Sequence, residues 1–192
     1  MAINTTFVVS AQWLRAFCRL IRECLPSTKV LIGGYFYATY AREFLGIDAD
    51  VCCVGEGEVR SAQIVSALKT GSPLEAIPGL YLRRPDGSVH HTGPSHPLNM
   101  SALPPVNWSL AERIEPKLSL ADDYFQLSVE TQRGWFFKCE FCTYRTIADL
   151  SIMGPEQAVD TLLTSRAAKK AILTIVDATA TVPHARFKEM MR

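Results

Sequence analysis

The first part of the chain alternates short, continuously apolar runs with stretches in which apolar residues recur at helical spacing. The apolar runs predict strands at residues 3–9, 30–32 and 49–54, and the helical stretches lie at 13–24, 40–45 and 60–69. Strands that are apolar throughout are typical of a parallel sheet with helices on both faces. The pattern therefore predicts one α/β domain over residues 1–75.

The pattern changes after residue 75. A strand-like run at 80–83 is followed by the turn Pro85-Asp86-Gly87, and prolines then recur up to residue 105. These features predict a hairpin and an irregular linker over residues 76–120.

A second structured unit is predicted over residues 121–192. Its strands are expected at 125–131 and 171–176, and its helices at 155–165 and 184–192. The alternation again indicates an α/β arrangement with parallel strands. Two strands leave unpaired sheet edges and exposed apolar surface, so we expect self-association through these edges.

Composition and charge are typical of a globular protein and argue against nucleic-acid and membrane binding. The 192 residues are 48% hydrophobic and 20% charged, which is ordinary for a globular protein. Twenty basic and 19 acidic residues give a net charge of +1 without a basic stripe, so nucleic acid is not an indicated partner. No apolar run approaches the roughly 20 residues that cross a bilayer, and no signal-peptide pattern begins the chain. We therefore expect a cytoplasmic protein that does not bind a membrane.

Six cysteines are present, and Cys139 and Cys142 form a C-x-x-C motif. Without a secretory signal, metal or redox chemistry is the favoured use of this motif. Cys18 and Cys24 lie on a predicted helix and are interpreted as small core residues.

The most informative segment, residues 133–145, reads Arg-Gly-Trp-Phe-Phe-Lys-Cys-Glu-Phe-Cys-Thr-Tyr-Arg. It resembles the C-x-x-x-C-x-x-C loop of radical SAM (S-adenosylmethionine) enzymes, which follows their first barrel strand. The resemblance implies that Cys139 and Cys142 bind irons of a 4Fe-4S cluster and that Phe141 contacts the adenine of S-adenosylmethionine. It also implies that Asp177 lies near the S-adenosylmethionine site, although a turn or helix-capping role is equally open.

Trp135 stands where the first cysteine of that loop is expected. An indole nitrogen only donates hydrogen bonds, and a cubane cluster with two protein thiolates is labile. We therefore predict weak, air-sensitive cluster binding, with Cys52 and Cys53 as the remaining thiols that could supply a third ligand. Two other interpretations of the C-x-x-C motif are a zinc site, with His184 as the downstream candidate ligand, and a redox dithiol.

Glycines directly follow the second and third predicted strands. These segments resemble the second half of the cobalamin-binding Rossmann-like domain that precedes the barrel in cobalamin-binding radical SAM enzymes. Such folds bind cofactors at the carboxyl edge of the sheet, where glycines allow close backbone approach. Simple strand-ending turns are the alternative interpretation. The resemblance implies cobalamin contacts at Gly33, Gly34, Gly55, Gly57 and Glu58.

The resemblance implies a partial Rossmann-like domain followed by the first units of a partial TIM barrel. Because only half of the cobalamin-binding domain is implied, we expect cobalamin to bind weakly. No Asp-x-His-x-x-Gly motif occurs, so we expect no histidine ligand to cobalt. The function hypothesis is a fragment, short at both ends, of an enzyme that cleaves S-adenosylmethionine reductively and uses cobalamin, a 4Fe-4S cluster and an external electron donor. The alternatives are a degenerate non-catalytic remnant and a small zinc-binding α/β module. The sequence does not identify the substrate.

Overall fold

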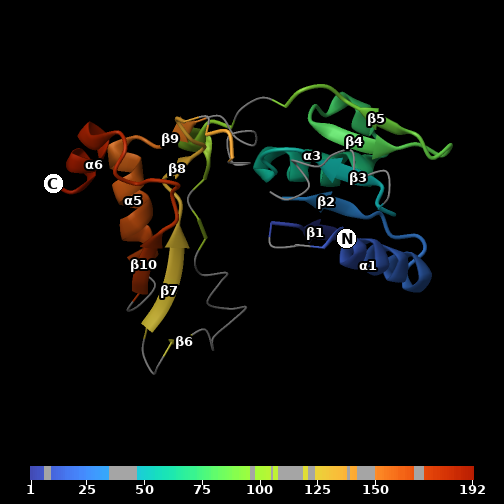
Figure 1. The fold of residues 1–192 in the computed structure, drawn as a ribbon, viewed down its shortest axis with the longest axis horizontal. Coiled ribbons are helices and arrows are strands. Elements are labelled where there is room, and N and C mark those ends of the chain that lie inside the picture. The colour runs from blue at the N-terminus through green and yellow to red at the C-terminus, as the bar shows by residue number, and fades with distance from the viewer. Residues whose placement is uncertain are drawn as a thin grey trace. The chain divides into compact units, whose positions relative to one another are not determined.

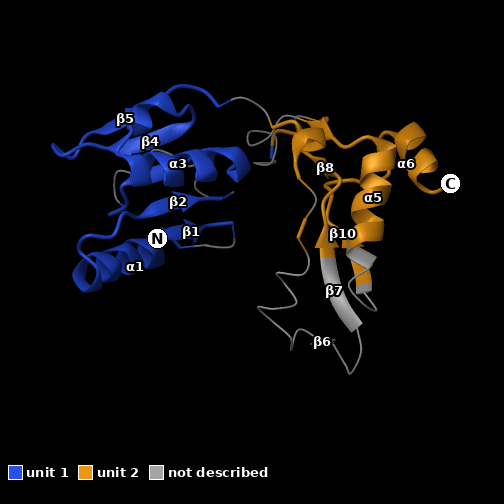
Figure 2. Ribbon diagram, turned by 180° about the vertical axis from the view of Figure 1, so that it is seen from behind, with its two compact units in different colours: residues 1–97, 141–148 blue, residues 98–140, 149–192 orange. Residues whose placement is uncertain are grey.

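The chain folds into two compact units, residues 1–97 with 141–148 (unit 1) and residues 98–140 with 149–192 (unit 2), as Figure 2 shows. The computed structural model describes residues 1–6, 10–34, 47–95, 98–104, 106–107, 119–120, 124–137, 139–141, 150–166 and 171–192. Both units combine helices with parallel strands, so the predicted α/β class is confirmed.

Unit 1 contains a five-stranded sheet (Figure 1). Its strands, in spatial order, are β1 (Ala2–Asn4), β2 (Leu31–Gly33), β3 (Val51–Cys53), β4 (Leu80–Arg83) and β5 (Val89–His91). The first three are parallel, and β4 and β5 are antiparallel additions. The predicted hairpin thus forms, and it extends the sheet of unit 1 through hydrogen bonds to β3.

Two helices pack against opposite faces of this sheet. Helix α1 (Ala11–Cys24) begins at Ser10, whose hydroxyl accepts a hydrogen bond from the Trp13 backbone nitrogen at 3.2 Å. Its buried residues share a core cluster with Cys52, whereas α3 (Glu58–Thr70) contributes to a second cluster with Val51 and Cys53. Because successive side chains of a strand point to opposite faces, the apolar run of β3 is buried on both sides.

The interpretation of Cys18 as a core residue is confirmed, and that of Cys24 is wrong. Cys18 is fully buried, whereas Cys24 is exposed at the last residue of α1. Six positions lie about 240° apart around a helix with 3.6 residues per turn, so both thiols cannot face one core.

Unit 2 is built around two parallel strands, β7 (Tyr124–Val129) and β10 (Ala171–Ile175). The chain between them forms β9 (Ser151–Ile152) and α5 (Pro155–Arg166), so the strands are joined by a helical crossover. The short strand β8 (Gln132–Arg133) pairs with β9, and β6 (Ser119–Leu120) pairs with β7. Helix α6 (His184–Met190) follows β10.

Part of the predicted linker packs in unit 2. The turn η3 (Met100–Ala102) buries Met100 in a cluster with Met153 and Ala158. The Met100 backbone nitrogen donates to the Ser151 hydroxyl at 2.9 Å. In unit 1, a second short turn, η2 (Leu74–Ala76), connects α3 to β4.

Several predictions fall outside the described residues. These are the end of the first strand at 7–9, the helix at 40–45, and the predicted iron ligand Cys142. Among the described helices, none is long and apolar enough to cross a membrane.

Candidate cofactor sites

The end of β2 is closed by Gly34, whose φ of +109° is rarely adopted by residues with side chains. A Cβ atom here would lie 2.5 Å from Asn4 Oδ1 and 2.9 Å from the backbone nitrogens of Thr5 and Thr6. The Gly33 carbonyl accepts hydrogen bonds from the backbone nitrogen and hydroxyl of Thr5, at 2.7 and 3.0 Å. The two glycines therefore join the ends of β1 and β2, and the chain itself fills the space beside Gly34.

The loop after β3 is contacted from α3 by Arg60, a side chain that sequence reasoning missed. Arg60 is only 7% exposed, and its guanidinium donates to the Glu56 carbonyl. A Cβ atom on Gly55, where φ is +77°, would lie 3.3 Å from the Arg60 guanidinium and from the Ser95 hydroxyl. A Cβ atom on Gly79 would lie 3.3 Å from the same guanidinium. Gly55 therefore faces protein atoms.

Gly57 and Glu58 lie in a more open position. Gly57 caps α3, and its carbonyl accepts the Ser61 backbone nitrogen at 2.7 Å. Apart from Gly57 itself and its two chain neighbours, no described atom lies within 4 Å of the position that a Gly57 Cβ would take. Glu58 is exposed in the first helical turn, where its negative charge is favourable. A ligand could therefore approach the backbone at Gly57 without displacing described protein atoms.

The structure brings both glycine loops to one edge of the sheet. Strands β2 and β3 are parallel, with Gly33 paired to Cys53, so their carboxyl ends meet. Within the described part of the chain, no histidine belongs to either loop: His90 and His91 lie in β5, and His184 begins α6. The described residues thus offer an open backbone position but no histidine ligand for cobalt.

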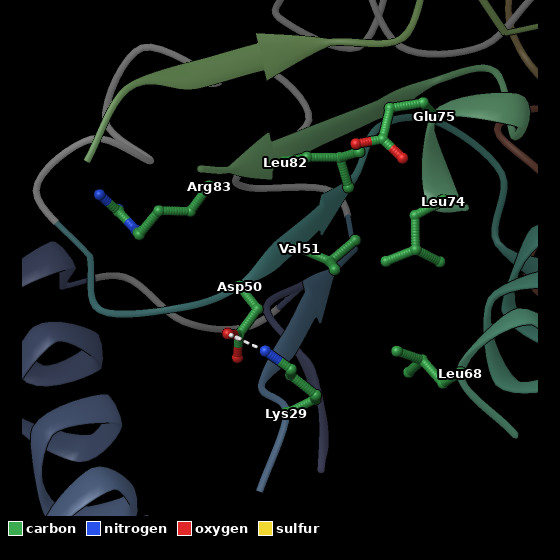
Figure 3. A pocket seen from close by; sticks show the side chains of 8 residues that line it. All are labelled: Lys29, Asp50, Val51, Leu68, Leu74, Glu75, Leu82 and Arg83. Atoms are coloured by element: carbon green, nitrogen blue, oxygen red, sulfur yellow. Dashed lines mark hydrogen bonds and ion pairs between the residues drawn. The ribbon is translucent and has the colours of Figure 1, made fainter. Parts of the chain in front are cut away.

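A separate pocket lies at the opposite, amino edge of the same strands (Figure 3). Its volume is about 160 Å³, which is below the range of typical ligand sites. Lys29 lies 3.3 Å from an Asp50 carboxylate oxygen, and Asp50 also accepts from Arg22 and from the Val30 backbone nitrogen. Burial alone would raise the pKa of Asp50, but the Val30 N–H and Arg22 outweigh it and hold the pKa below its ordinary value. The acidic group is already satisfied within the protein, so this pocket is not a candidate cofactor site.

The predicted cysteine loop (residues 133–145) begins in unit 2 at Arg133, the last residue of β8, and its residues from Phe141 onward are assigned to unit 1. Arg133 lies at its base and forms an ion pair with Glu130 at 2.6 Å. The Trp135 ring packs edge-on against Phe137, with ring centroids 5.6 Å apart. The Trp135 ring therefore contacts another aromatic residue of its own loop.

The predicted cluster and S-adenosylmethionine contacts are only partly described. Cys139 is half-buried and carries a free thiol. Phe141 is 91% exposed, and Phe136 and Phe137 are also exposed. Cys142 lies outside the described residues. The loop therefore presents aromatic side chains and one accessible thiol to its surroundings.

Asp177 follows β10, as predicted, and its carboxylate binds the base of the cysteine loop. Asp177 Oδ1 accepts the backbone nitrogens of Thr131 at 2.6 Å and Gln132 at 3.0 Å, and Oδ2 accepts the Thr131 hydroxyl at 2.6 Å. Both carboxylate oxygens are thus engaged by the chain itself.

Arg186 in α6 is a further residue that sequence reasoning missed. It is 8% exposed and donates to the carbonyls of Thr131 and Met153, each at 2.9 Å. Burial lowers the pKa of Arg186, and the nearby Asp177 carboxylate opposes that shift. Arg186 lies 55 residues from Thr131, so no local pattern links the two. The one available signal was the expectation of a positive charge near the strand ends.

The residues present fit a 4Fe-4S cluster incompletely. The loop supplies two cysteines, and the Trp135 indole cannot ligate iron. Among the described residues, no group of three or more His, Cys, Asp or Glu side chains is arranged to hold a metal ion. Cys52 is fully buried, and burial raises its pKa to about 12, so it is not an available thiolate.

Comparisons with known proteins agree with the sequence motifs. No protein-family model matches the chain. The anaerobic magnesium-protoporphyrin IX monomethyl ester cyclase of Synechocystis sp. is 26% identical over 133 residues, which cover 67% of this chain and 26% of the cyclase. The chain thus spans about a quarter of the length of this curated relative.

Two solved structures share the architecture. The radical S-adenosylmethionine methyltransferase TsrM from Kitasatospora setae matches all of this chain with a TM-score of 0.69 and 18% identity, over 38% of its own length. The cobalamin-dependent S-adenosylmethionine radical enzyme OxsB matches 98% of it with a TM-score of 0.71 and 18% identity, over 27% of its own length.

The chain has the fold of the cobalamin-dependent radical SAM enzymes. The resemblance predicted from the cysteine loop and the glycine-ended strands is confirmed. In this chain, the glycine loops follow the parallel strands β2 and β3, and the cysteine loop follows the parallel strand β7 after a short connection.

Proposed function

We propose that this chain carries the cobalamin-binding and cluster-loop regions of a cobalamin-dependent radical SAM enzyme. The observation that supports this most is the cysteine loop directly after the parallel strand β7, in a chain whose preceding sheet carries glycine loops at its carboxyl edge. Cobalamin is assigned to the edge formed by Gly33, Gly34, Gly55, Gly57 and Glu58. S-adenosylmethionine and the cluster are assigned to the cysteine loop.

The chain's own residues have distinct roles in this proposal. Gly57 leaves open backbone for cobalamin, and Cys139 and Cys142 are the iron ligands of the loop. Phe141 is exposed and free to stack on adenine. When bound, the cluster would supply the electron that cleaves S-adenosylmethionine reductively. An external donor would then return an electron to the cluster.

A second candidate is a non-catalytic protein of the same fold. Trp135 favours it, because the loop lacks the first thiol of the motif. Under this proposal the chain binds cobalamin but holds no stable cluster.

Anaerobic reconstitution with iron and sulfide tests the assignment of the cysteine loop, and a stable cluster in the unaltered chain would exclude the non-catalytic candidate. We expect the unaltered chain to hold little iron, a Trp135→Cys variant to hold several irons per chain, and a matched Trp135→Phe control to resemble the unaltered chain. Zinc analysis of the same samples tests the zinc-module alternative. Failure of Trp135→Cys to gain iron or charge-transfer absorbance would overturn the assignment of the cysteine loop.

Cobalamin binding is tested by titration with aquacobalamin, followed by visible absorbance. We expect a saturable change that weakens in a Gly57→Val variant. Gly154→Val, which also adds a side chain into open space, is the matched control. Equal binding by the unaltered chain and Gly57→Val would contradict the assigned position.

A further inference from the structure

Thr131 lies two residues after the end of β7 and two residues before the cysteine loop begins at Arg133. It is fully buried, and each of its polar groups is bonded. Its backbone nitrogen and hydroxyl each donate to the Asp177 carboxylate at 2.6 Å. Its carbonyl accepts from Arg186 at 2.9 Å and from the Met153 backbone nitrogen at 3.1 Å.

Two charged side chains therefore hold one buried threonine from different elements. Asp177 reaches Thr131 from the end of β10, and Arg186 reaches it from α6. Hydrogen bonds with an ionised partner are about twice as strong as neutral ones. Asp177 also accepts the Gln132 backbone nitrogen, so the contact extends one residue toward the loop.

Several described side chains of the loop are exposed. Phe136, Phe137 and Phe141 are exposed, and Cys139 is half-buried. The position of the loop relative to β7 and β10 therefore depends on how firmly its base is held.

We propose that Asp177 and Arg186 form a clamp on Thr131 that positions the cysteine loop. Asp177 is then a positioning residue, because both of its oxygens are engaged by Thr131 and Gln132. The consequence for the cluster rests on the function proposed above, whereas the clamp itself does not.

Amide hydrogen exchange of the whole chain tests the clamp without any cofactor. In Asp177→Ala, we expect the Thr131 and Gln132 amides to exchange about tenfold faster or more, because their acceptor is removed. Exchange in the β7 and β10 ladder should change little. Asp177→Asn keeps an acceptor oxygen and should stay close to the unaltered chain. Asp160→Ala removes an exposed carboxylate of α5 and is the matched control.

Thr131→Val provides a milder perturbation if Asp177→Ala does not fold. It removes the hydroxyl contact alone, and we expect a few-fold acceleration at Gln132 with an unchanged ladder. Unchanged exchange at residues 131–132 in Asp177→Ala, or in Thr131→Val where the former does not fold, would overturn the clamp.

The effect on the loop is measured in the Trp135→Cys background by iron per chain after anaerobic reconstitution. We expect Asp177→Ala to reduce iron retention several-fold and Asp177→Asn to preserve most of it. If Trp135→Cys holds no cluster, the proposed function fails, and the exchange data still decide the clamp. Equal iron retention in Asp177→Ala and its parent would show that the clamp does not position the ligands.

Discussion

Each unit uses a buried arginine to reach the loop at the carboxyl end of its parallel strands, but the two loops are held in different ways. In unit 1, Arg60 donates to the Glu56 carbonyl and lies beside Gly55. In unit 2, Arg186 donates to the Thr131 carbonyl, and the Asp177 carboxylate binds the same threonine.

The difference separates two kinds of constraint. The glycine loops depend on positive φ angles at Gly34 and Gly55 and on a close approach that leaves no room for a side chain at Gly34. The base of the cysteine loop depends on polar side chains that satisfy buried backbone groups. Unit 1 should therefore be sensitive to added volume, and unit 2 to the loss of polar groups.

The largest effect is expected from Gly34→Ala. The new Cβ atom would lie 2.5 Å from Asn4 Oδ1 and 2.9 Å from the Thr5 backbone nitrogen, at a positive φ. Strain and overpacking together should lower the free energy of unfolding by about 2 to 5 kcal/mol. Gly57→Ala, which enters open space, should change it by less than about 1 kcal/mol. Urea unfolding followed by circular dichroism compares them, and equal losses would refute the volume argument.

A second comparison replaces each buried arginine by methionine, which keeps much of the apolar stem. Arg186→Met removes the guanidinium that donates to the buried Thr131 carbonyl and that lies near the Asp177 charge. The free energy of unfolding should fall by about 2 to 4 kcal/mol. Arg60→Met removes the donor to the carbonyl of Glu56, a residue that is only half-buried, and should cost about 1 to 2 kcal/mol.

The control for this pair is Arg19→Met, on the exposed surface of α1, with an expected change within about 0.5 kcal/mol. All three variants are measured by the same urea unfolding. A larger loss for Arg60→Met than for Arg186→Met would reverse the proposed division between the units.

Local sequence patterns predicted most elements of both units. Alternation of apolar runs and helical spacing identified α3 (Glu58–Thr70) and β3 (Val51–Cys53), because burial of both faces of β3 leaves a continuous apolar run. The position of Asp177 at a strand end was also predictable. The positions of helices, strands and strand-end residues can be predicted because they depend on residues close together in the sequence.

The partners of these residues were not predictable from one sequence. Thr131 is 46 residues from Asp177 and 55 from Arg186, and no local periodicity relates them. The approach of Arg60 to Gly79 is likewise long-range, because the hairpin joins the sheet by pairing with a strand far away in the sequence. Long-range polar contacts follow from the packed fold and leave no short-range pattern.

The buried thiol of Cys52 in unit 1 makes the free energy of unfolding depend on pH. Burial, with a smaller contribution from Cys53, raises the pKa of Cys52 from 9.0 to about 12. Between these values the unfolded chain has lost a proton that the folded chain retains, so stability is full below pH 9 and falls as pH rises. The slope is about 1.4 kcal/mol per pH unit for this thiol.

Replacement of Cys52 by valine should remove that part of the slope. The free energy of unfolding is measured at several pH values from 8 to 10.5 for the variant and the unaltered chain. Both proteins contain the same lysines and tyrosines, so the difference between their slopes isolates Cys52. Cys139→Ala, at a half-buried thiol of the cysteine loop, is the matched control. Identical pH slopes in Cys52→Val and the unaltered chain would contradict the role of burial.

The smallest effect on stability is expected from Phe141→Ala in the cysteine loop. Phe141 is 91% exposed, so its removal forfeits little buried apolar surface, and the free energy of unfolding should change by less than about 0.5 kcal/mol. Binding of S-adenosylmethionine to the reconstituted Trp135→Cys protein should nevertheless weaken about tenfold, because stacking on adenine is lost. Leu163→Ala, at an exposed apolar residue of α5, should affect neither quantity. Calorimetry and urea unfolding measure the two quantities separately. A stability loss above about 1 kcal/mol would show that Phe141 packs against the protein, and unchanged binding would remove it from the proposed S-adenosylmethionine site.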